Sequence, residues 1–388
     1  MSGKSSVEVK FATLRRISPS GFTALSLCPL RAACIAAGQP TLLPQSPAST
    51  TGTISHKVLE AAGRAKASSE ADTFIKVWDE IAEVEEAKMQ LNTLQRRFIP
   101  LRQHDLRYEV IRWQTCQRAS FISQRALLTK RSPLAGYTQS HYEEFIQSSD
   151  GTIAGVIDFV QETQQGAILR DYKTGTIWDD SHVQLNGHPA VKQEYQVQLK
   201  LYAALWWTKT GMWPLRLELV PLDCDPIEVI FDHAEYLALL ESAQATLANT
   251  NDHIRKVLQE LPPNATTLAT ASPSICRYCS FRPGCPAYWN ARGAISTTEV
   301  TYDWPVDIRG TLQKKQMLGN GLLMLQLQTE QGDIALVHLS AGLTSYPDLA
   351  NVHDGDWIEI YNLSSKDGEK LFSETKLTAA YSCSESEP

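Results

Sequence analysis

One stretch of sequence decides the fold: residues 155–173, GVIDFVQETQQGAILRDYK. It covers most of two runs rich in apolar and β-branched residues, Ile153–Val160 and Ala167–Tyr172. A Gln-Gln-Gly turn separates the runs, and this pattern predicts an antiparallel pair of strands. A further strand is expected before them at Glu143–Gln147, and a helix after them from Gln193 to about Thr208. The fold class expected for the chain is α/β.

The turn also predicts which residues face each other. If it is centred between Gln164 and Gln165, residues whose numbers sum to 329 lie opposite, and Asp158 and Asp171 are such a pair. Their Cβ atoms would be about 4.5–5.5 Å apart, and Lys173, two residues further, would share their face. Two carboxylates that close repel each other unless a cation lies between them, and their oxygens suit Mg²⁺ or Mn²⁺. The pattern therefore predicts a divalent-cation site.

Other polar residues are expected near this pair. His56 follows a Pro-rich loop, Gln39–Thr53, at the start of an expected helix, and its imidazole is able to complete a metal shell. Gln198 and Tyr202 stand four apart on one face of the helix after the strands. Gly155, without a side chain, would let a substrate backbone approach.

Three of the eight cysteines, Cys276, Cys279 and Cys285, fall within ten residues with C-x2-C-x5-C spacing. In a reducing compartment such a group favours metal binding over disulfides. Three thiolates cannot complete a tetrahedral site, so a fourth ligand must come from elsewhere. Cys28 is the preferred choice and Cys34 the alternative. By spacing alone, four thiolates suit zinc and an iron–sulfur cluster equally well.

Charge is unevenly distributed along the chain. The net charge is −7, yet residues 91–131 carry nine basic side chains against two acidic ones. A basic stretch on an acidic body favours a phosphate-binding channel over a general polycation, with solvated helix faces as the alternative. Aromatic side chains in this stretch, Phe98, Trp113 and Phe121, would stack on bases or pack in a core. The arginines expected to contact nucleic acid are Arg96, Arg97, Arg102, Arg107, Arg112 and Arg118.

The chain lacks a signal-peptide pattern and an apolar stretch of membrane-spanning length, so a soluble, cytoplasmic protein without membrane contact is expected.

Near the N-terminus, Ser18 or Ser20 is expected to cap a helix that runs through Cys28. Five short strand runs after residue 300 suggest a small, OB-like barrel. The predicted organisation is a loose segment 1–17, a main domain 18–292 with a helical and basic insertion 54–131, a β-rich domain 300–381 and a tail 382–388.

Taken together, these pieces resemble the RecB-like branch of the PD-(D/E)XK nuclease superfamily, and in particular its iron–sulfur members, the AddB-type and CRISPR-adaptation nucleases. The resemblance runs from about Ser18 to Trp289. Each motif is weak alone, and the six in order are specific. They are SPSGFTALSLCP (18–29), GTISHKVLE (52–60), GVID (155–158), DYKTG (171–175), QLKLY (198–202) and CRYCSFRPGC (276–285).

The resemblance implies a restriction-endonuclease-like core and a division of roles among the candidate residues. It implies a [4Fe–4S] cluster that staples the N-terminal helix to the end of the core. The implied metal ligands are His56, Asp158, Asp171 and the carbonyl of Tyr172. The implied catalytic group is Asp158, Asp171 and Lys173, with Gln198 and Tyr202 beside them. The implied cluster ligands are Cys28, Cys276, Cys279 and Cys285.

The function implied is that of a Mg²⁺- or Mn²⁺-dependent deoxyribonuclease in DNA repair, recombination or antiviral defence. Its substrate would be DNA that is single-stranded or has single-stranded ends, cut as an endonuclease or an exonuclease. A helicase or another defence protein is an expected partner. Two alternatives stay open: a catalytically silent DNA-binding scaffold of a helicase–nuclease complex, and a zinc-stapled RNA-processing protein.

Overall fold

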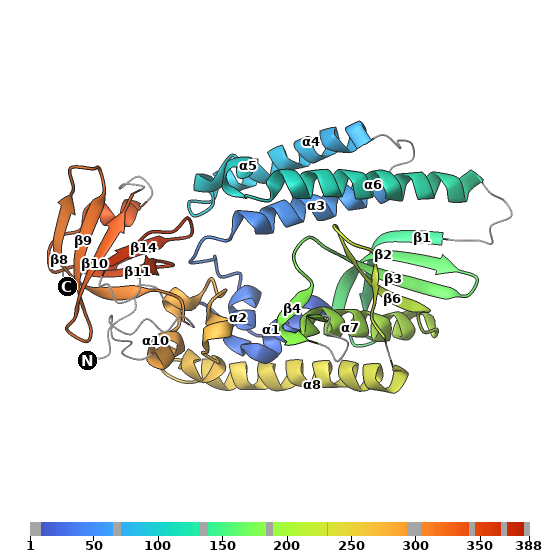
Figure 1. The fold of residues 1–388 in the computed structure, drawn as a ribbon. Coiled ribbons are helices and arrows are strands. Elements are labelled where there is room, and N and C mark those ends of the chain that lie inside the picture. Colours follow the sequence, from blue (N-terminus) through green and yellow to red (C-terminus); the bar gives the residue numbers. More distant parts are fainter. Residues whose placement is uncertain are drawn as a thin grey trace. The chain divides into compact units, whose positions relative to one another are not determined.

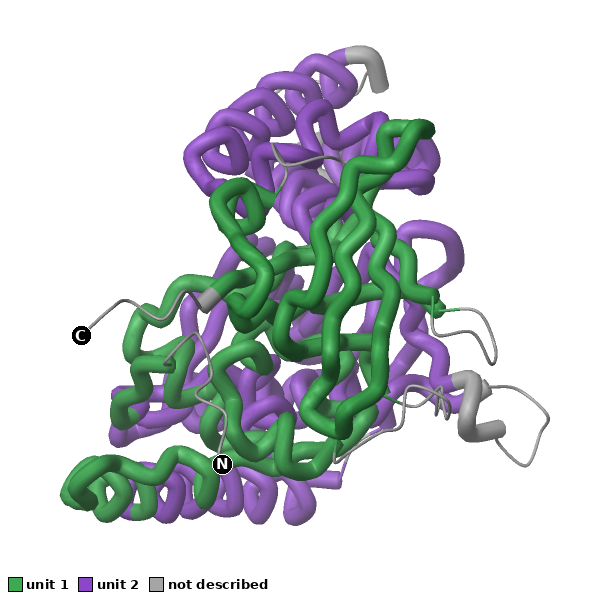
Figure 2. The backbone as a smooth tube through the Cα atoms, turned by 90° about the vertical axis from the view of Figure 1, so that its left-hand side faces the viewer, with its two compact units in different colours: residues 1–13, 27–46, 253–388 green, residues 14–26, 47–252 purple. Residues whose placement is uncertain are grey.

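The computed structural model describes residues 9–64, 71–131, 139–183, 189–230, 232–292, 304–340, 346–365 and 371–383. The chain divides into two compact units, which are coloured separately in Figure 2. Unit 1 comprises Met1–Thr13, Leu27–Ser46 and His253–Pro388, and unit 2 comprises Leu14–Ser26 and Pro47–Asp252. Both units are therefore assembled from segments distant in sequence. The predicted loose segment is described only from residue 9 onward, and the predicted tail only as far as Cys383.

Unit 2 is built on a five-stranded sheet of order β1-β2-β3-β6-β7. Strands β3 and β6 are parallel and the other neighbouring pairs are antiparallel. Two further strands, β4 (Trp178–Val183) and β5 (Pro189–Val191), form a separate small sheet. The strands of the main sheet are β1 (Gln139–Gln147), β2 (Ala154–Thr163), β3 (Gly166–Lys173), β6 (Arg216–Pro221) and β7 (Ile227–Glu228).

Helices cover both faces of this sheet. In Figure 1, α3, α4 and α6 lie together on one side, and α7 lies on the other. Helix α7 ends where Gly211 adopts a left-handed backbone, with φ of 72°, and donates its N–H to Trp207 O over 2.8 Å. The helices that lie wholly or mostly in unit 2 are α1 (Pro19–Leu27), α3 (Pro47–Arg64), α4 (Ala71–Gln90), η1 (Arg96–Phe98), α5 (Leu101–His104), α6 (Tyr108–Arg131), α7 (Gln193–Thr210) and α8 (His233–Leu258).

The sequence located most of these elements. The strands flanking the Gln-Gln-Gly turn and the helix from Gln193 are confirmed, and Ser18 Oγ accepts the Gly21 N–H over 3.0 Å at the start of α1. The expected loop over Gln39–Thr53 is wrong from Pro47 onward, because α3 begins there. A proline at the first helical position costs no hydrogen bond, so the Pro- and Ser-rich composition was compatible with a helix start.

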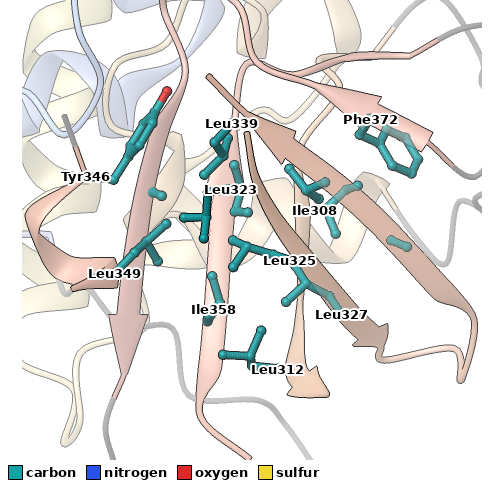
Figure 3. Close-up of a cluster of buried hydrophobic side chains, with 14 of the residues drawn as sticks. Ile308, Leu312, Leu323, Leu325, Leu327, Leu339, Tyr346, Leu349, Ile358 and Phe372 are labelled. Atoms are coloured by element: carbon teal, nitrogen blue, oxygen red, sulfur yellow. The ribbon is translucent and has the colours of Figure 1, made fainter. Parts of the chain in front are cut away.

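The second sheet lies in unit 1 and has seven strands in the order β12-β13-β10-β9-β8-β11-β14. Strands β8, β9 and β10 form an antiparallel meander, and β13 runs parallel to β10. Leucine side chains alternate along β9, with Leu323, Leu325 and Leu327 all facing the core (Figure 3). The strands are β8 (Ile308–Met317), β9 (Leu323–Thr329), β10 (Ile334–Leu339), β11 (Trp357–Tyr361), β12 (Ser364–Ser365), β13 (Leu371–Ser373) and β14 (Ala379–Cys383).

The expected small barrel is corrected to an open, curled half-barrel. Among the described residues the sheet has two edges, β12 and β14, which do not pair with each other. The sequence did not predict β14. This strand pairs with β11 and therefore occupies the sheet edge at which a strand closing the barrel would have to pair. Short helices accompany this sheet in unit 1. They are α2 (Pro29–Ala36), η2 (Ala265–Leu268), α9 (Pro273–Cys276), η3 (Arg282–Gly284), α10 (Pro286–Arg292) and η4 (Pro347–Leu349).

A buried ion pair ties the cysteine-containing loop to this sheet within unit 1. Arg282 and Asp307 are 2% and 0% exposed, and Arg282 Nε donates to Asp307 Oδ2 over 2.7 Å. Asp307 also accepts hydrogen bonds from the Tyr288 hydroxyl at 2.7 Å and the Asn362 N–H at 2.8 Å. The Arg282 guanidinium, followed by Arg292 and the Asn362 N–H, keeps the pKa of Asp307 below its usual value despite burial.

We expect Asp307→Asn to lower the free energy of unfolding by about 3–5 kcal/mol, because it leaves the buried guanidinium of Arg282 without a counter-charge. Urea denaturation followed by circular dichroism measures the loss. The exposed carboxylate Asp348 provides the control, and Asp348→Asn should leave the transition unchanged. Equal stability of the two variants would contradict a structural role for the buried pair.

Candidate active site

The two aspartates lie at the end of the β2–β3 ladder. The last pair of this ladder is Phe159 opposite Arg170, whose numbers sum to 329, and this is the predicted register. Asp158 and Asp171 are the next residues along each strand. They are largely buried, with side-chain exposures of 16% and 4%. The structure therefore brings the two carboxylates together as the turn position predicted.

Asp158 is held by two neighbours. Its Oδ2 accepts the backbone N–H of Tyr172 over 2.7 Å, and His56 Nδ1 of α3 lies 3.6 Å from the same oxygen. His56 is predicted at a helix start but stands in the middle of α3, because that helix begins at Pro47. The imidazole still reaches the carboxylate pair, so the structure places His56 beside Asp158.

A chain of polar contacts orients Lys173. Its Nζ donates to Gln198 Oε1 over 3.0 Å, and Gln198 Nε2 donates to Asp171 Oδ1 over 2.6 Å. Lys173 Nζ also lies 2.6 Å from Asp171 Oδ2, and 4.5 Å above the ring centre of Tyr195. Tyr195 was missed by the sequence reasoning, although it stands one turn before Gln198 on the same helix. These contacts fix the ammonium group beside the two carboxylates.

Tyr202 acts on the backbone of β2 rather than on the carboxylates. Its hydroxyl donates to the carbonyl oxygen of Val156 over 2.7 Å. A Cβ on Gly155 would lie 2.8 Å from Pro19 Cδ and 3.1 Å from Tyr202 Cε1. The expectation that Gly155 admits a substrate backbone is therefore wrong, because its missing side chain makes room for Tyr202 and α1. Glycine at this position lets α7 pack closely on β2.

Burial and charge shift the protonation of this group. Burial, and after it the carboxylate of Asp171, raises the pKa of Asp158 well above its ordinary value. Burial lowers the pKa of His56, so its imidazole is held neutral and has a lone pair for a cation. A divalent cation would relieve both effects, because it compensates the paired negative charges and accepts a neutral imidazole as ligand.

The profile of the PD-(D/E)XK nuclease superfamily matches residues 16–286. This range includes the complete constellation of His56, Asp158, Asp171 and Lys173, with Gln198 and Tyr202. The chain belongs to the PD-(D/E)XK nuclease superfamily. The sequence Asp171-Tyr172-Lys173 has the acidic-x-lysine pattern that appears in the superfamily's name.

Other comparisons add little to this assignment. No curated protein matches the chain. The solved structure described as "Crystal structure of SSO0001" is 16% identical, covers 54% of this chain and 97% of its own, and has a TM-score of 0.21. Within the described part, no helix is long and apolar enough to cross a membrane.

The residues fit a divalent cation in chemical type. Two adjoining carboxylates and a neutral imidazole are oxygen and nitrogen donors of the kind such ions prefer. Asp171 Oδ2 is buried with the Lys173 ammonium 2.6 Å away, and as a carboxylate oxygen it has a further lone pair for a ligand. Among the described residues, no three His, Cys, Asp or Glu side chains lie close enough together to hold a metal ion as they stand.

The arginines of the basic stretch separate into two groups. Arg96, Arg102 and Arg107 are exposed. Arg112 is paired with Asp79 at 2.7 Å, and Arg118 Nη2 donates to the carbonyls of Pro221 and Cys224 at 3.0 Å. Arg97 lies over the ring of Phe98, which is buried and unable to stack on a base. The role of all six arginines in DNA binding stays a prediction, and Arg96, Arg102 and Arg107 are the three whose side chains are exposed.

The cysteines gather within unit 1. Burial, followed by the thiolates of Cys279, Cys285 and Cys28, raises the pKa of Cys34 to about 12. Burial likewise raises the pKa of Cys276 to about 11 and that of Cys285 to about 12, with neighbouring thiolates contributing to both. Five thiols are therefore within electrostatic range of one another, and both candidates for the fourth ligand are among them.

We expect Asp158→Asn to stabilise the protein at neutral pH in EDTA. The raised pKa means that folded Asp158 keeps its proton to higher pH than the unfolded chain does, so stability falls as the pH rises from about 4 through that raised pKa. The asparagine variant does not ionise at this position and so does not lose stability as the pH rises. Its melting temperature should exceed that of the wild type at pH 7 and match it below about pH 4. Thermal melts across pH measure the difference, with the exposed Asp223→Asn as control. A variant that melts lower at every pH would contradict the assigned repulsion.

Proposed function

We propose that this protein is a divalent-metal-dependent nuclease that hydrolyses phosphodiester bonds of DNA at the Asp158–Asp171–Lys173 centre. The observation that supports this most is the adjacency of the two buried carboxylates to an ammonium group held by Gln198. The superfamily assignment points to the same chemistry. An ordinary ion pair on the protein surface would not need a third residue, such as Gln198, hydrogen-bonded to both of its members.

Each residue has a definite task in this proposal. Asp158, Asp171, His56 and the carbonyl of Tyr172 would hold Mg²⁺ or Mn²⁺. When bound, the ion lowers the pKa of a water molecule and polarises a phosphoryl oxygen. Lys173 donates hydrogen bonds from a fixed position, which stabilises the negative charge that develops on the phosphate oxygens. Gln198 orients both Lys173 and Asp171, and Tyr202 fixes the strand that carries Asp158.

The substrate proposed is DNA with a single-stranded portion. Arg96, Arg102 and Arg107 are exposed in the segment before α6, where they are available to phosphates. Trp113 of α6 is 65% exposed and offers a ring face to a base. The pathway would be DNA repair, recombination or antiviral defence, with a helicase or another protein as partner.

We also propose that the cysteines of unit 1 hold a [4Fe–4S] cluster. Cys28 stands at the N-terminus of α2, and Cys276, Cys279 and Cys285 lie in the loop around α9 and η3. Arg31 and Arg282 provide positive charge near Cys279, which would help to balance four thiolates. The mutual effects of the thiols on their pKa values support this gathering. Zinc is the alternative occupant of the same ligands.

We expect Lys173→Ala to reduce cleavage by about 10²–10³-fold, because it removes a preorganised donor to the developing charge. The assay uses end-labelled single- and double-stranded DNA with Mg²⁺, Mn²⁺ or EDTA. DNA binding, measured by fluorescence anisotropy, should be nearly unchanged. Lys209→Ala, which removes an exposed lysine in the last turn of α7, is the matched control and should cleave as the wild type does.

Cleavage that proceeds equally in EDTA would refute the metal-dependent mechanism. A wild-type protein that binds DNA but cuts none of these substrates with either metal would favour the silent scaffold instead. Equal cleavage by Lys173→Ala and Lys209→Ala would remove Lys173 from the proposed machinery.

For the cluster, we expect Cys276→Ser to abolish bound iron and visible absorbance in protein purified without oxygen, and to lower its melting temperature. Cys116→Ser is the control, since Cys116 is a buried cysteine of α6 that lies in unit 2. Comparing Cys28→Ser with Cys34→Ser identifies the fourth ligand as the one whose loss removes the iron. One zinc ion per chain without iron would replace the cluster by a zinc site.

A further inference from the structure

Glu143 of β1 stands directly opposite Asp158. The β1–β2 ladder pairs Tyr142 with Phe159 and Glu144 with Ile157, so the position between them matches Glu143 to Asp158. The ladder omits this one pair although the register on both sides is the same. A carboxylate on β1 therefore adjoins the residue whose other neighbour is Asp171, and three adjacent strands carry acidic residues in one row.

The missing pair has a backbone cause. Glu143 has φ of 52°, one of two positive values among the described non-glycine residues. A glutamate in the left-handed region is strained, and such a conformation persists only where the surrounding structure enforces it. Glu143 also lines a cavity of 520 Å³ together with His56, Glu60 and Thr174. The cavity adjoins the carboxylate pair, because His56 is also the neighbour of Asp158.

Glu143 differs from the acidic residue next to it. Glu144 is paired with Lys209 and lies 3.7 Å from His141 Nδ1. Glu143 makes no hydrogen bond or ion pair with any described residue, although it is only partly exposed. Its carboxylate thus has no direct ion-pair partner among the described residues, and the positive charge of Arg64 acts on it only through space.

The charges of this group act on one another. Burial and then Glu60 raise the pKa of Glu143. After burial and Asp171, the charge of Glu143 is also among the causes that raise the pKa of Asp158, and it contributes to the raised pKa of Tyr202. The carboxylate is therefore near enough for its field to reach the centre from the side opposite Asp171.

We propose that Glu143 is a positioning residue that strengthens the hold of this site on its divalent cation through the field it exerts at Asp158. This inference rests on the proposed metal-dependent function. The strained backbone places the carboxylate in the cavity instead of in a normal strand position. The positive charge of the cation is then balanced by three carboxylates instead of by the two aspartates alone.

The test is calorimetric titration of the full-length, metal-free protein with Mn²⁺ alone, without DNA. Glu143→Gln should weaken Mn²⁺ binding by about 5- to 30-fold, the range expected for one unit charge acting on a divalent ion across several ångströms of partly solvated protein. Glu144→Gln, which removes the same charge one residue away, should bind as the wild type does. Asp158→Asn marks the loss of the site itself.

Two further variants separate charge from backbone. Glu143→Gly relieves the left-handed strain, so its melting temperature should be no lower than that of the wild type while its Mn²⁺ affinity falls as in Glu143→Gln. Glu143→Asp, which keeps the charge, should recover part of the affinity. A residue with a purely structural role would show neither the affinity loss in a stable glycine variant nor the recovery with aspartate.

The outcomes distinguish this inference from the proposed function. If Asp158→Asn loses Mn²⁺ binding while Glu143→Gln binds as the wild type does, Glu143 has no such role and the metal site stands. Equal weakening in Glu143→Gln and Glu144→Gln would also overturn it, because the effect would then be one of net charge. A wild type that binds no Mn²⁺, or an Asp158→Asn variant that binds normally, would overturn the metal site and the inference together.

Discussion

The repulsion between Asp158 and Asp171 is the constraint around which unit 2 is organised. Two carboxylates on adjoining strands are unfavourable unless something compensates them, and burial increases the penalty. Three features reduce it: the Tyr172 N–H on Asp158, the Lys173 ammonium beside Asp171 and the Gln198 amide that joins them. Each comes from an element whose place depends on the central sheet, so the fold and the charged centre are maintained together.

Close packing of α7 on β2 makes these contacts possible. Gly155 leaves room for the Tyr202 ring, and the Tyr202 hydroxyl binds the backbone of the same strand. One turn earlier on α7, Gln198 reaches the carboxylate and the ammonium group. A bulkier residue at position 155 would move the helix away and would separate Gln198 from both partners. The helix thus connects the packing of the sheet to the geometry of the candidate site.

Sequence reasoning succeeded where local rules apply and failed where distant segments decide. The turn between Gln164 and Gln165 sets the strand register, so the approach of Asp158 to Asp171 was predictable. The open edge of the C-terminal sheet was not, because it depends on β14 pairing along β11. Glu143 was also missed. Its register position was readable from the strands, but its positive φ and its place in the cavity arise only from tertiary packing.

By itself the sequence determined the strand pair, the helix that follows it and the residue types suited to a divalent cation and to a group of thiolates. Strand alternation and turn position are properties of neighbouring residues, so they are legible in the chain. Only the tertiary structure decided that His56 reaches Asp158 and that Cys34 joins the other thiols. It also decided that Arg112 and Arg118 bind other residues of the same chain. These facts depend on contacts between residues far apart in sequence, whose distances no local pattern specifies.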